Sequence, residues 1–169
     1  MFEQASRTVV DSLEFARAGQ TLRGRVPISA LTRLQDSLCD SLGAVDFVVR
    51  GGFDARQRPT LTLEVTGVLH LQCQRCLGQL DYPLQLGNTL LLASPAPGAS
   101  GEPDDDAGES IESSAELDVV ALVEDEIILG LPYSPRHPDA GCLANRERSA
   151  RQRNESAFAR LAALKRNLN

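Results

Sequence analysis

The chain has 169 residues, of which 42% are hydrophobic and 24% charged, and its formal net charge is −6. This apolar content is enough for a compact core, which excludes a wholly disordered chain, and the length is typical of a single domain. No apolar run approaches the roughly 18 residues of a membrane-spanning helix, and the N-terminal residues lack the apolar stretch of a secretory signal. Four cysteines are too few for a disulfide scaffold, so we expect a cytoplasmic protein with reduced thiols.

The charged residues are unevenly distributed. Residues 1–101 are balanced, residues 102–126 carry eleven acidic and no basic side chains, and residues 145–169 carry seven basic and two acidic ones. Such a chain does not present a positive surface to nucleic acid as a whole, so only the basic tail is a candidate for RNA contact. A solvated tail, or one that pairs with acidic groups, is the simpler alternative.

The first part of the chain is expected to mix helical and extended segments. Residues 1–20 have a weak helical pattern that ends at Gly19, and residues 21–27 have the pattern of a short strand. A helix is predicted over residues 29–41 from its start signals and from leucines at three- and four-residue spacing, namely Pro27, Ser29, Leu31, Leu34 and Leu38. Cys39 falls on the apolar face of this helix and is predicted to be buried.

Alternating apolar and polar residues predict the strands that follow, over residues 45–49, 60–72 and 79–92. The last two are joined by the short segment CQRCLG, which predicts a hairpin and therefore an antiparallel sheet. Gly67 lies within the second of these strands and suggests a bulge that changes the face.

The last part of the chain combines an acidic linker, a helix and a basic tail. Residues 94–115 are predicted to form a mobile acidic loop, and residues 116–130 a helix that ends at Gly130. The expected fold is therefore an α+β single domain over residues 1–144, an antiparallel β-meander packed by helices. The tail, residues 145–169, is predicted to contain a short amphipathic helix.

The cysteines give the clearest chemical pattern. Cys73 and Cys76 form a C-x2-C pair in the predicted hairpin turn, as in a zinc knuckle, and His137 and Cys142 are able to complete four zinc ligands. His70 is an alternative ligand. The pair is also compatible with ordinary reduced thiols and, less readily, with a redox motif, because that motif normally opens a helix.

No catalytic motif is present, so we expect no enzymatic activity and no small-molecule substrate. The adjacent acids Glu124, Asp125 and Glu126 point about 100° apart on a helix, which excludes a facing acid/base pair. They are predicted to form either a solvated face or a binding edge for a basic partner. With five Phe, two Tyr and no Trp, mostly at core-like positions, the chain is not expected to read single-stranded bases.

Three segments resemble one known family. LQCQRCLGQL at residues 71–80, LDVVALVEDEIILGLPYSPRH at residues 117–137 and FARLAALK at residues 158–165 are similar to the YceD family of large ribosomal RNA subunit accumulation proteins. The resemblance extends over residues 20–168, in matching order. Some relatives carry a second cysteine pair after the helix, where this chain has His137 and Cys142.

The resemblance implies a bacterial, non-enzymatic ribosome-biogenesis factor that supports synthesis, processing or stability of 23S ribosomal RNA. A basic ribosomal protein or assembly factor would then bind the acids at residues 124–126, since such surfaces attract basic partners. The alternative is a small zinc-knuckle RNA-binding protein that contacts ribosomal RNA through its tail. The residues expected to make those contacts are Arg151, Arg153, Arg160, Lys165 and Arg166.

Overall fold

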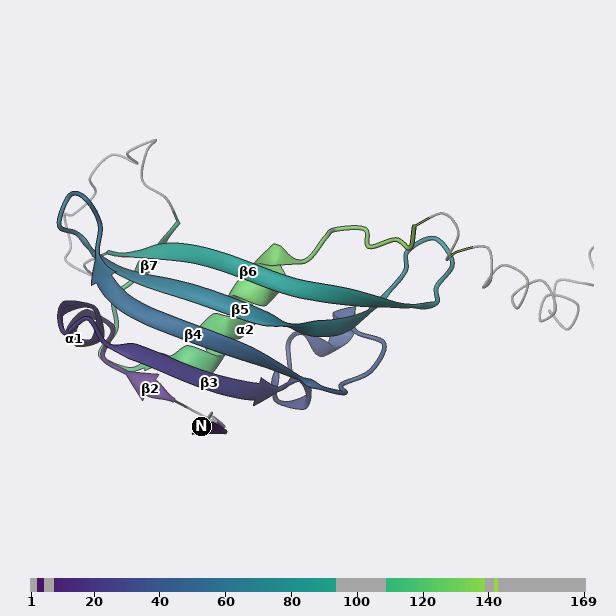
Figure 1. Cartoon of the computed structure of the whole chain (residues 1–169), viewed down its shortest axis with the longest axis horizontal. Coiled ribbons are helices and arrows are strands. Elements are labelled where there is room, and N and C mark those ends of the chain that lie inside the picture. Colours follow the sequence, from purple (N-terminus) through teal and green to yellow (C-terminus); the bar gives the residue numbers. More distant parts are fainter. Residues whose placement is uncertain (1–2, 5–7, 94–108, 139–141, 143–169) are drawn as a thin grey trace, which may run out of the picture. The chain divides into compact units, whose positions relative to one another are not determined.

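A computed structural model of the chain describes residues 3–4, 8–93, 109–138 and 142 (Figure 1). The chain divides into two compact units. The first contains Met1–His70 and Asp81–Pro132, and the second contains Leu71–Leu80 and Tyr133–Asn169. Within the described ranges, no helix is both long enough and apolar enough to cross a membrane.

A six-stranded sheet has the order β1-β3-β4-β5-β6-β7. Its long strands are β3 (Thr21–Pro27), β4 (Ala44–Phe53), β5 (Pro59–Gln72) and β6 (Gln79–Ala93). Each lies beside the next in the chain, and β4 is antiparallel to both β3 and β5. Two short strands add at the edges in parallel orientation, β1 (Glu3–Gln4) beside β3 and β7 (Ser110–Glu112) beside β6. The predicted antiparallel meander is confirmed.

One face of the sheet supplies the core, as the two-residue period of a strand requires. In β4 and β5 its buried members include Val45, Phe47, Val49, Leu61, Leu63, Val65 and Leu69. Leu69 has the same parity as Leu61, so the predicted change of face at Gly67 is wrong. The pairing of β4 with β5 inserts no extra residue from Pro59 to Thr66. A Cβ at Gly67 would lie 2.9 Å from the Val45 side chain, so the glycine leaves room for the close approach of this neighbour.

The helix α2 (Val119–Gly130) crosses this face of the sheet (Figure 1). Asp118 caps its N-terminus by accepting hydrogen bonds from the N–H groups of Val120 and Ala121. Its buried apolar side chains are Val119, Leu122, Val123 and Ile127. The helix predicted over residues 116–130 is therefore confirmed, and with it the α+β class. Just before it, β8 (Leu117–Asp118) pairs antiparallel with β2 (Val9–Val10) in a separate two-stranded sheet.

A shorter helix, α1 (Ser12–Arg17), forms in the N-terminal region, where a weak helical pattern extends over residues 1–20. Asp11 caps it by accepting from the N–H of Glu14, and it ends before Gly19, which has a φ of +59°. Its backbone approaches β4 very closely: a Cβ at Gly51 would lie 2.3 Å from the carbonyl oxygen of Phe15. Only glycine leaves room for this contact.

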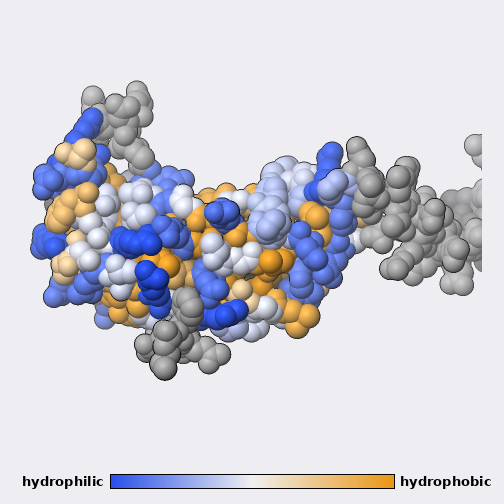
Figure 2. Space-filling view, in the orientation of Figure 1, coloured by the Kyte–Doolittle hydropathy of each residue, from blue (hydrophilic) through white to orange (hydrophobic). Residues whose placement is uncertain are grey.

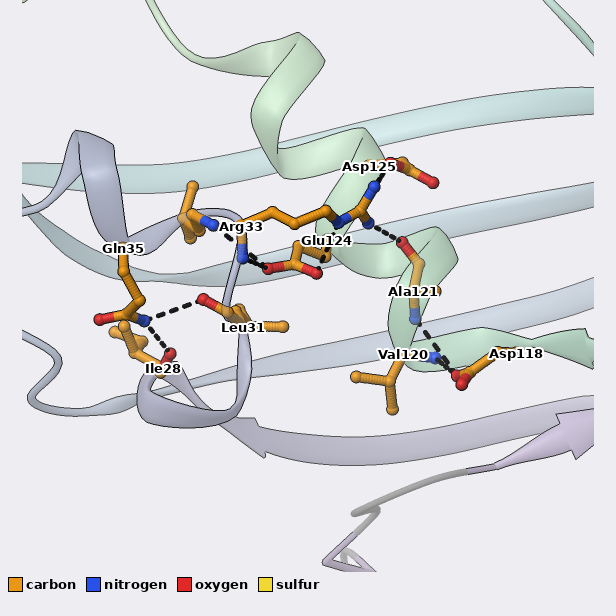
Figure 3. A network of polar contacts seen from close by, with 10 residues as sticks. Ile28, Leu31, Arg33, Gln35, Asp118, Val120, Ala121, Glu124 and Asp125 are labelled. Carbon is orange, nitrogen blue, oxygen red and sulfur yellow. Dashed lines mark hydrogen bonds and ion pairs between the residues drawn. The ribbon is translucent and has the colours of Figure 1, made fainter.

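The helix predicted over residues 29–41 is wrong. The segment forms two single 3₁₀ turns, η1 (Ile28–Ala30) and η2 (Gln35–Ser37). Leu31 and Leu34 are fully buried, as their spacing predicts. The backbone of this segment, however, forms hydrogen bonds with side chains instead of helical ones (Figure 3). A Glu124 carboxylate oxygen accepts from the N–H groups of Arg33 and Leu34 at 2.6 and 3.2 Å.

The carbonyl groups of the same segment are also engaged elsewhere. The side-chain amide of Gln35 donates to the carbonyls of Ile28 and Leu31, at 2.7 and 2.9 Å. In an α-helix these N–H and C=O groups would bond along the helix. Because side chains bind them instead, the segment folds back as turns.

The sheet face opposite α2 is mainly polar. Figure 2, in the orientation of Figure 1, shows hydrophilic residues spread among the hydrophobic ones on this face. Arg50 of β4 pairs with Glu64 of β5 through two nitrogen–oxygen contacts of 2.6 and 3.2 Å. Arg25 lies 3.7 Å from Asp46 on the neighbouring strand. Two pairs of opposite charges on adjacent strands thus lie on this face.

The predicted acidic loop, residues 94–115, differs from expectation where it is described. Ser110–Glu112 form β7, which pairs with Leu91–Ala93, and Ser113 is buried. The strand forms because β6 offers an edge with backbone groups to satisfy. Residues 94–108 and the predicted tail helix lie outside the described residues.

Candidate metal centre

The C-x2-C pair forms a tight turn at the end of β5. The N–H of Cys73 donates to the carbonyl of Gly78, and the N–H of Leu77 donates back to the carbonyl of Cys73, both at 2.9 Å. Leu77 has a φ of +58°, a left-handed conformation that closes the turn. This backbone places both cysteine side chains on the same side, as a metal-binding knuckle requires.

A second segment of the same unit runs beside this turn. The N–H of Gln74 donates to the carbonyl of Pro135 at 2.9 Å, and the N–H of His137 lies 3.5 Å from the Cys73 sulfur. His137 is flanked by Arg136 and Pro138, and the prolines at 135 and 138 restrict the backbone on either side of it. The histidine is thereby held against the cysteine pair.

The structure brings together all four residues that the sequence singled out. The donor atoms of Cys73, Cys76, His137 and Cys142 lie within 4.8 Å of one another. Cys73 Sγ and Cys142 Sγ are 3.7 Å apart, and His137 Nδ1 is 3.4 Å from Cys76 Sγ and 3.8 Å from Cys142 Sγ. A tetrahedral zinc ion would place two sulfurs about 3.8 Å apart, and a sulfur and a nitrogen about 3.6 Å apart. These three spacings fit such an ion.

A backbone contact fixes the tautomer of His137. Its Nε2 lies 2.6 Å from the carbonyl oxygen of Gln79. Because a carbonyl only accepts hydrogen bonds, Nε2 carries the proton, and in the neutral ring Nδ1 then presents its lone pair to the three sulfurs. A ligating histidine is commonly oriented in this way through its other nitrogen.

The surroundings of the thiols favour one thiolate strongly. Burial opposes charge on Cys73, but the backbone N–H groups of His137, Arg75 and Cys76 outweigh it and lower the pKa of this thiol to about 5. Burial raises the pKa of Cys142, with the nearby sulfurs adding to that effect and Arg75 opposing it. The Cys73 thiolate raises the pKa of His137. A divalent cation among these atoms would offset the repulsion between neighbouring thiolates.

The arrangement is that of a structural site. All four donors come from the chain, so a tetrahedral ion would have no open position for water or substrate. Cys73 and Cys142 are almost fully buried. The cluster can hold a metal ion and link residues that are 61 to 69 positions apart in the chain.

The three adjacent acids predicted as a binding edge lie in the first unit, and they differ in exposure. Glu124 and Glu126 are buried, whereas the side chain of Asp125 is half exposed. Arg33 Nε lies 3.0 Å from Glu124, and its terminal nitrogen lies 2.5 Å from Asp125 (Figure 3). Glu126 accepts from the side-chain amide of Asn88 at 2.9 Å.

Arg33 is a partner that sequence reasoning missed. It lay within a predicted helix, and no local pattern linked it to an acid 91 positions away. Only the packing of the 28–38 segment beside α2 makes this pairing possible.

His70 and Cys39 do not belong to the metal cluster. His70 Nδ1 lies 2.8 and 2.9 Å from the two carboxylate oxygens of Asp40, in the first unit. Cys39, predicted to be buried, is exposed. The reason is the missing helix: the backbone N–H of Cys39 donates to the carbonyl of His70 at 2.7 Å, which turns its side chain outward.

The basic residues predicted to contact RNA, from Arg151 to Arg166, lie outside the described residues. Among the described aromatics, two depart from the expectation that these side chains occupy core-like positions, since Tyr133 is fully exposed and Phe53 is 49% exposed.

Comparison with known proteins links these features to a family. A family model described as large ribosomal RNA subunit accumulation protein YceD matches residues 61–165, a segment that contains both the four-residue cluster and the three acids. A protein of Haemophilus influenzae with the same description is 27% identical over 138 residues, which cover 79% of this chain and 76% of that protein. No solved structure matches the chain.

Proposed function

Because the chain belongs to the YceD family, described as large ribosomal RNA subunit accumulation proteins, we propose that it supports the accumulation of 23S ribosomal RNA in the cytoplasm. The observation that carries the proposal is the family match over residues 61–165. The chain acts as a binding factor in large-subunit assembly rather than as an enzyme.

The test is depletion of the protein followed by a sucrose-gradient ribosome profile, with 23S and 16S RNA quantified. We expect a fall in 23S RNA and in free large subunits while 16S RNA is spared. Expression of the wild-type chain restores both. Unchanged 23S RNA after depletion would contradict the proposal.

The Cys73, Cys76, His137 and Cys142 cluster binds one structural zinc ion in this proposal. Its support is the donor set, the tetrahedral spacing and the fixed tautomer of His137. Thiolate and imidazole donors at these distances suit zinc better than calcium or magnesium, which prefer oxygen ligands.

Metal analysis of purified protein tests the zinc assignment. We expect about one zinc per chain, loss of that zinc in Cys142→Ser and Cys76→Ser, and full retention in the matched control Cys39→Ser, which changes the one cysteine outside the cluster. Cobalt substitution adds a spectroscopic readout, since cysteine thiolates bound to cobalt absorb strongly. Wild-type protein without bound metal, or a C39S variant that loses it, would contradict the assignment.

A basic ribosomal protein or assembly factor is the proposed protein partner of the acids at residues 124–126. Asp125 has a half-exposed carboxylate, which pairs with Arg33, whereas Glu124 and Glu126 are buried. We therefore expect Asp125→Lys to weaken capture of that partner at low salt. If Asp125→Lys captures the partner as well as wild type does, and this capture is still salt-sensitive, the acids do not form part of the interface.

A further inference from the structure

The outer edge of β6 is paired with another strand over only part of its length. Within the described part of the first unit, β7 lies beside residues 91–93 of β6, and no strand lies beside residues 83–87 on that side (Figure 1). An edge of this kind exposes backbone N–H and C=O groups and is a template for pairing with another chain. Pro83 suits such an edge, because proline has no N–H to donate to a neighbouring strand.

The direction of these backbone groups follows from the pairing with β7. The N–H of Leu91 donates to the carbonyl of Glu109 at 2.9 Å, so the backbone groups of Leu91 point outward. Alternate residues of a strand direct these groups to the same side, so those of Gln85 and Gly87 point outward as well. Both residues are exposed, and a Cβ added at Gly87 would meet no heavy atom within 4 Å outside its chain neighbours. An incoming strand therefore has room to approach this part of the edge.

A pocket lies beside the same edge, between β6 and the C-terminal end of α2. Its volume is about 250 Å³, and Leu86, Leu129 and Gly130 form its apolar part. The two elements fit closely, because a Cβ at Gly130 would lie 2.5 Å from the Leu86 side chain. Leu129 is nevertheless 72% exposed. An apolar side chain that entered this pocket would cover Leu129 and remove apolar surface from water.

The rest of the pocket is acidic. The side-chain amide of Asn88 donates to the carboxylates of both Glu109 and Glu126, and no basic residue in the described ranges pairs with either of them. The elements around the pocket, β6, β7 and α2, contain no basic residue. A lysine or arginine from a partner would therefore supply the positive charge that these two carboxylates lack.

We propose that the β6 edge and this pocket form a docking groove for an extended, basic segment of a partner protein, which adds as a strand beside residues 83–87. Leu86 and Asn88 lie two residues apart on one face of β6, so inward side chains of the added strand also lie two residues apart. One of them is apolar and packs against Leu86 and Leu129, and the next is a lysine or arginine that faces the two carboxylates.

This inference rests on the proposed function and deepens it, because it gives the basic partner a binding site and a sequence pattern. Charge selects that partner over two other occupants. A second copy of the chain that paired through its own β6 edge would bring like charges together across the groove. Residues 94–108, which connect β6 to β7 in the sequence, contain four acidic residues and no basic one, so the same acids repel them.

The experiment measures fluorescence anisotropy of a labelled peptide with the full-length chain at low salt. The peptide has about ten residues in the repeat Thr-Leu-Thr-Lys, which places leucine and lysine on one face of a strand. Its matched control has the repeat Thr-Thr-Leu-Lys, with the same composition and charge but with leucine and lysine on opposite faces. We expect the first peptide to bind about tenfold more tightly than the control.

Variants of the groove test each of its parts. Gln85→Pro removes one outward N–H at an edge that tolerates proline, so we expect about tenfold weaker binding of the first peptide, whereas the matched control Gln85→Ala keeps that N–H and binds like wild type. Leu129→Ala weakens binding about tenfold. Glu109→Gln weakens it about threefold at low salt and has little effect at high salt. Circular dichroism confirms that each variant remains folded.

Amide hydrogen exchange reports strand addition directly. We expect the N–H groups of Gln85 and Gly87 to exchange more slowly when the first peptide is bound to wild type, because they then donate to its carbonyls. Attraction between charges alone would leave both exchange rates unchanged, and that result would overturn the proposal.

Other outcomes would overturn it as well: equal binding of the two peptides, or unchanged binding by both Gln85→Pro and Leu129→Ala. Dimers of wild type that Gln85→Pro abolishes would identify a second copy as the occupant. Complementation of the depleted strain separates this failure from that of the proposed function. Variants that no longer bind the peptide yet restore 23S RNA would overturn the groove as the partner site alone, whereas a wild-type chain that fails to restore 23S RNA would overturn the proposed function.

Discussion

The carboxylate of Glu124 accepts two backbone N–H groups and one guanidinium nitrogen, although it lies in a run of three acids. Only 8% of its side chain is exposed. A buried carboxylate is tolerated because each contact comes from a donor, and hydrogen bonds to a charged acceptor are stronger than neutral ones. The residue therefore holds the 28–38 segment against α2.

Replacing Glu124 tests this role. Glu124→Ala leaves the N–H groups of Arg33 and Leu34 without their acceptor, so we expect the free energy of unfolding to fall by about 2–3 kcal/mol. Asp125→Ala is the matched control, because its ion pair with Arg33 is half exposed and contributes less than about 1 kcal/mol. Urea unfolding measures both. Equal losses for the two variants would contradict the assigned role of Glu124.

The Asp40 carboxylate gives a pH-dependent prediction. The N–H of Leu42, and then His70, lower its pKa below the ordinary value of 3.8. A lowered pKa means that the ionised form stabilises the fold above the unfolded pKa, and that this contribution disappears as pH falls through the folded pKa. We expect wild type to lose stability below about pH 4 more steeply than Asp40→Asn. Parallel curves of unfolding free energy against pH would contradict this.

At the scale of elements, the packing of helix α1 against β4 requires glycine at position 51. Gly51→Ala would place its Cβ 2.3 Å from the carbonyl oxygen of Phe15, so the helix must move away. We expect a loss of about 2 kcal/mol in the free energy of unfolding. The matched control is Gly87→Ala in β6, where nothing lies within 4 Å of the added atom, and which we expect to be neutral or slightly stabilising. A neutral Gly51→Ala would contradict the close approach.

The elements also show where local patterns are sufficient. The strands and α2 were predicted because alternation, three- to four-residue spacing and capping residues act within one segment. The 28–38 segment has the same leucine spacing as a helix, but its backbone groups are taken by Glu124 and Gln35. The spacing of apolar residues predicts which side chains are buried. It does not predict whether side chains elsewhere in the chain bind the backbone N–H and C=O groups.

At the scale of the whole molecule, the two units are expected to respond differently to metal removal. The metal cluster lies entirely in the second unit, so its loss removes the link between the C-x2-C turn and residues 135–142. After chelation, we expect amide hydrogen exchange to accelerate over residues 71–80, while the β4 amides at residues 45–49 keep their protection. Uniform acceleration in both units, or no change in either, would contradict this.

The sequence by itself determined the antiparallel meander, the helix that packs on it and the four residues of the metal cluster. These follow from alternation, helical spacing and the ligand chemistry of cysteine and histidine, which are properties of short segments. Only the tertiary structure decided which groups meet. It brought His137 to within 3.4 Å of Cys76, buried Glu124 beside Arg33 and exposed Tyr133 fully. These outcomes depend on contacts between residues far apart in the chain, which no local pattern encodes.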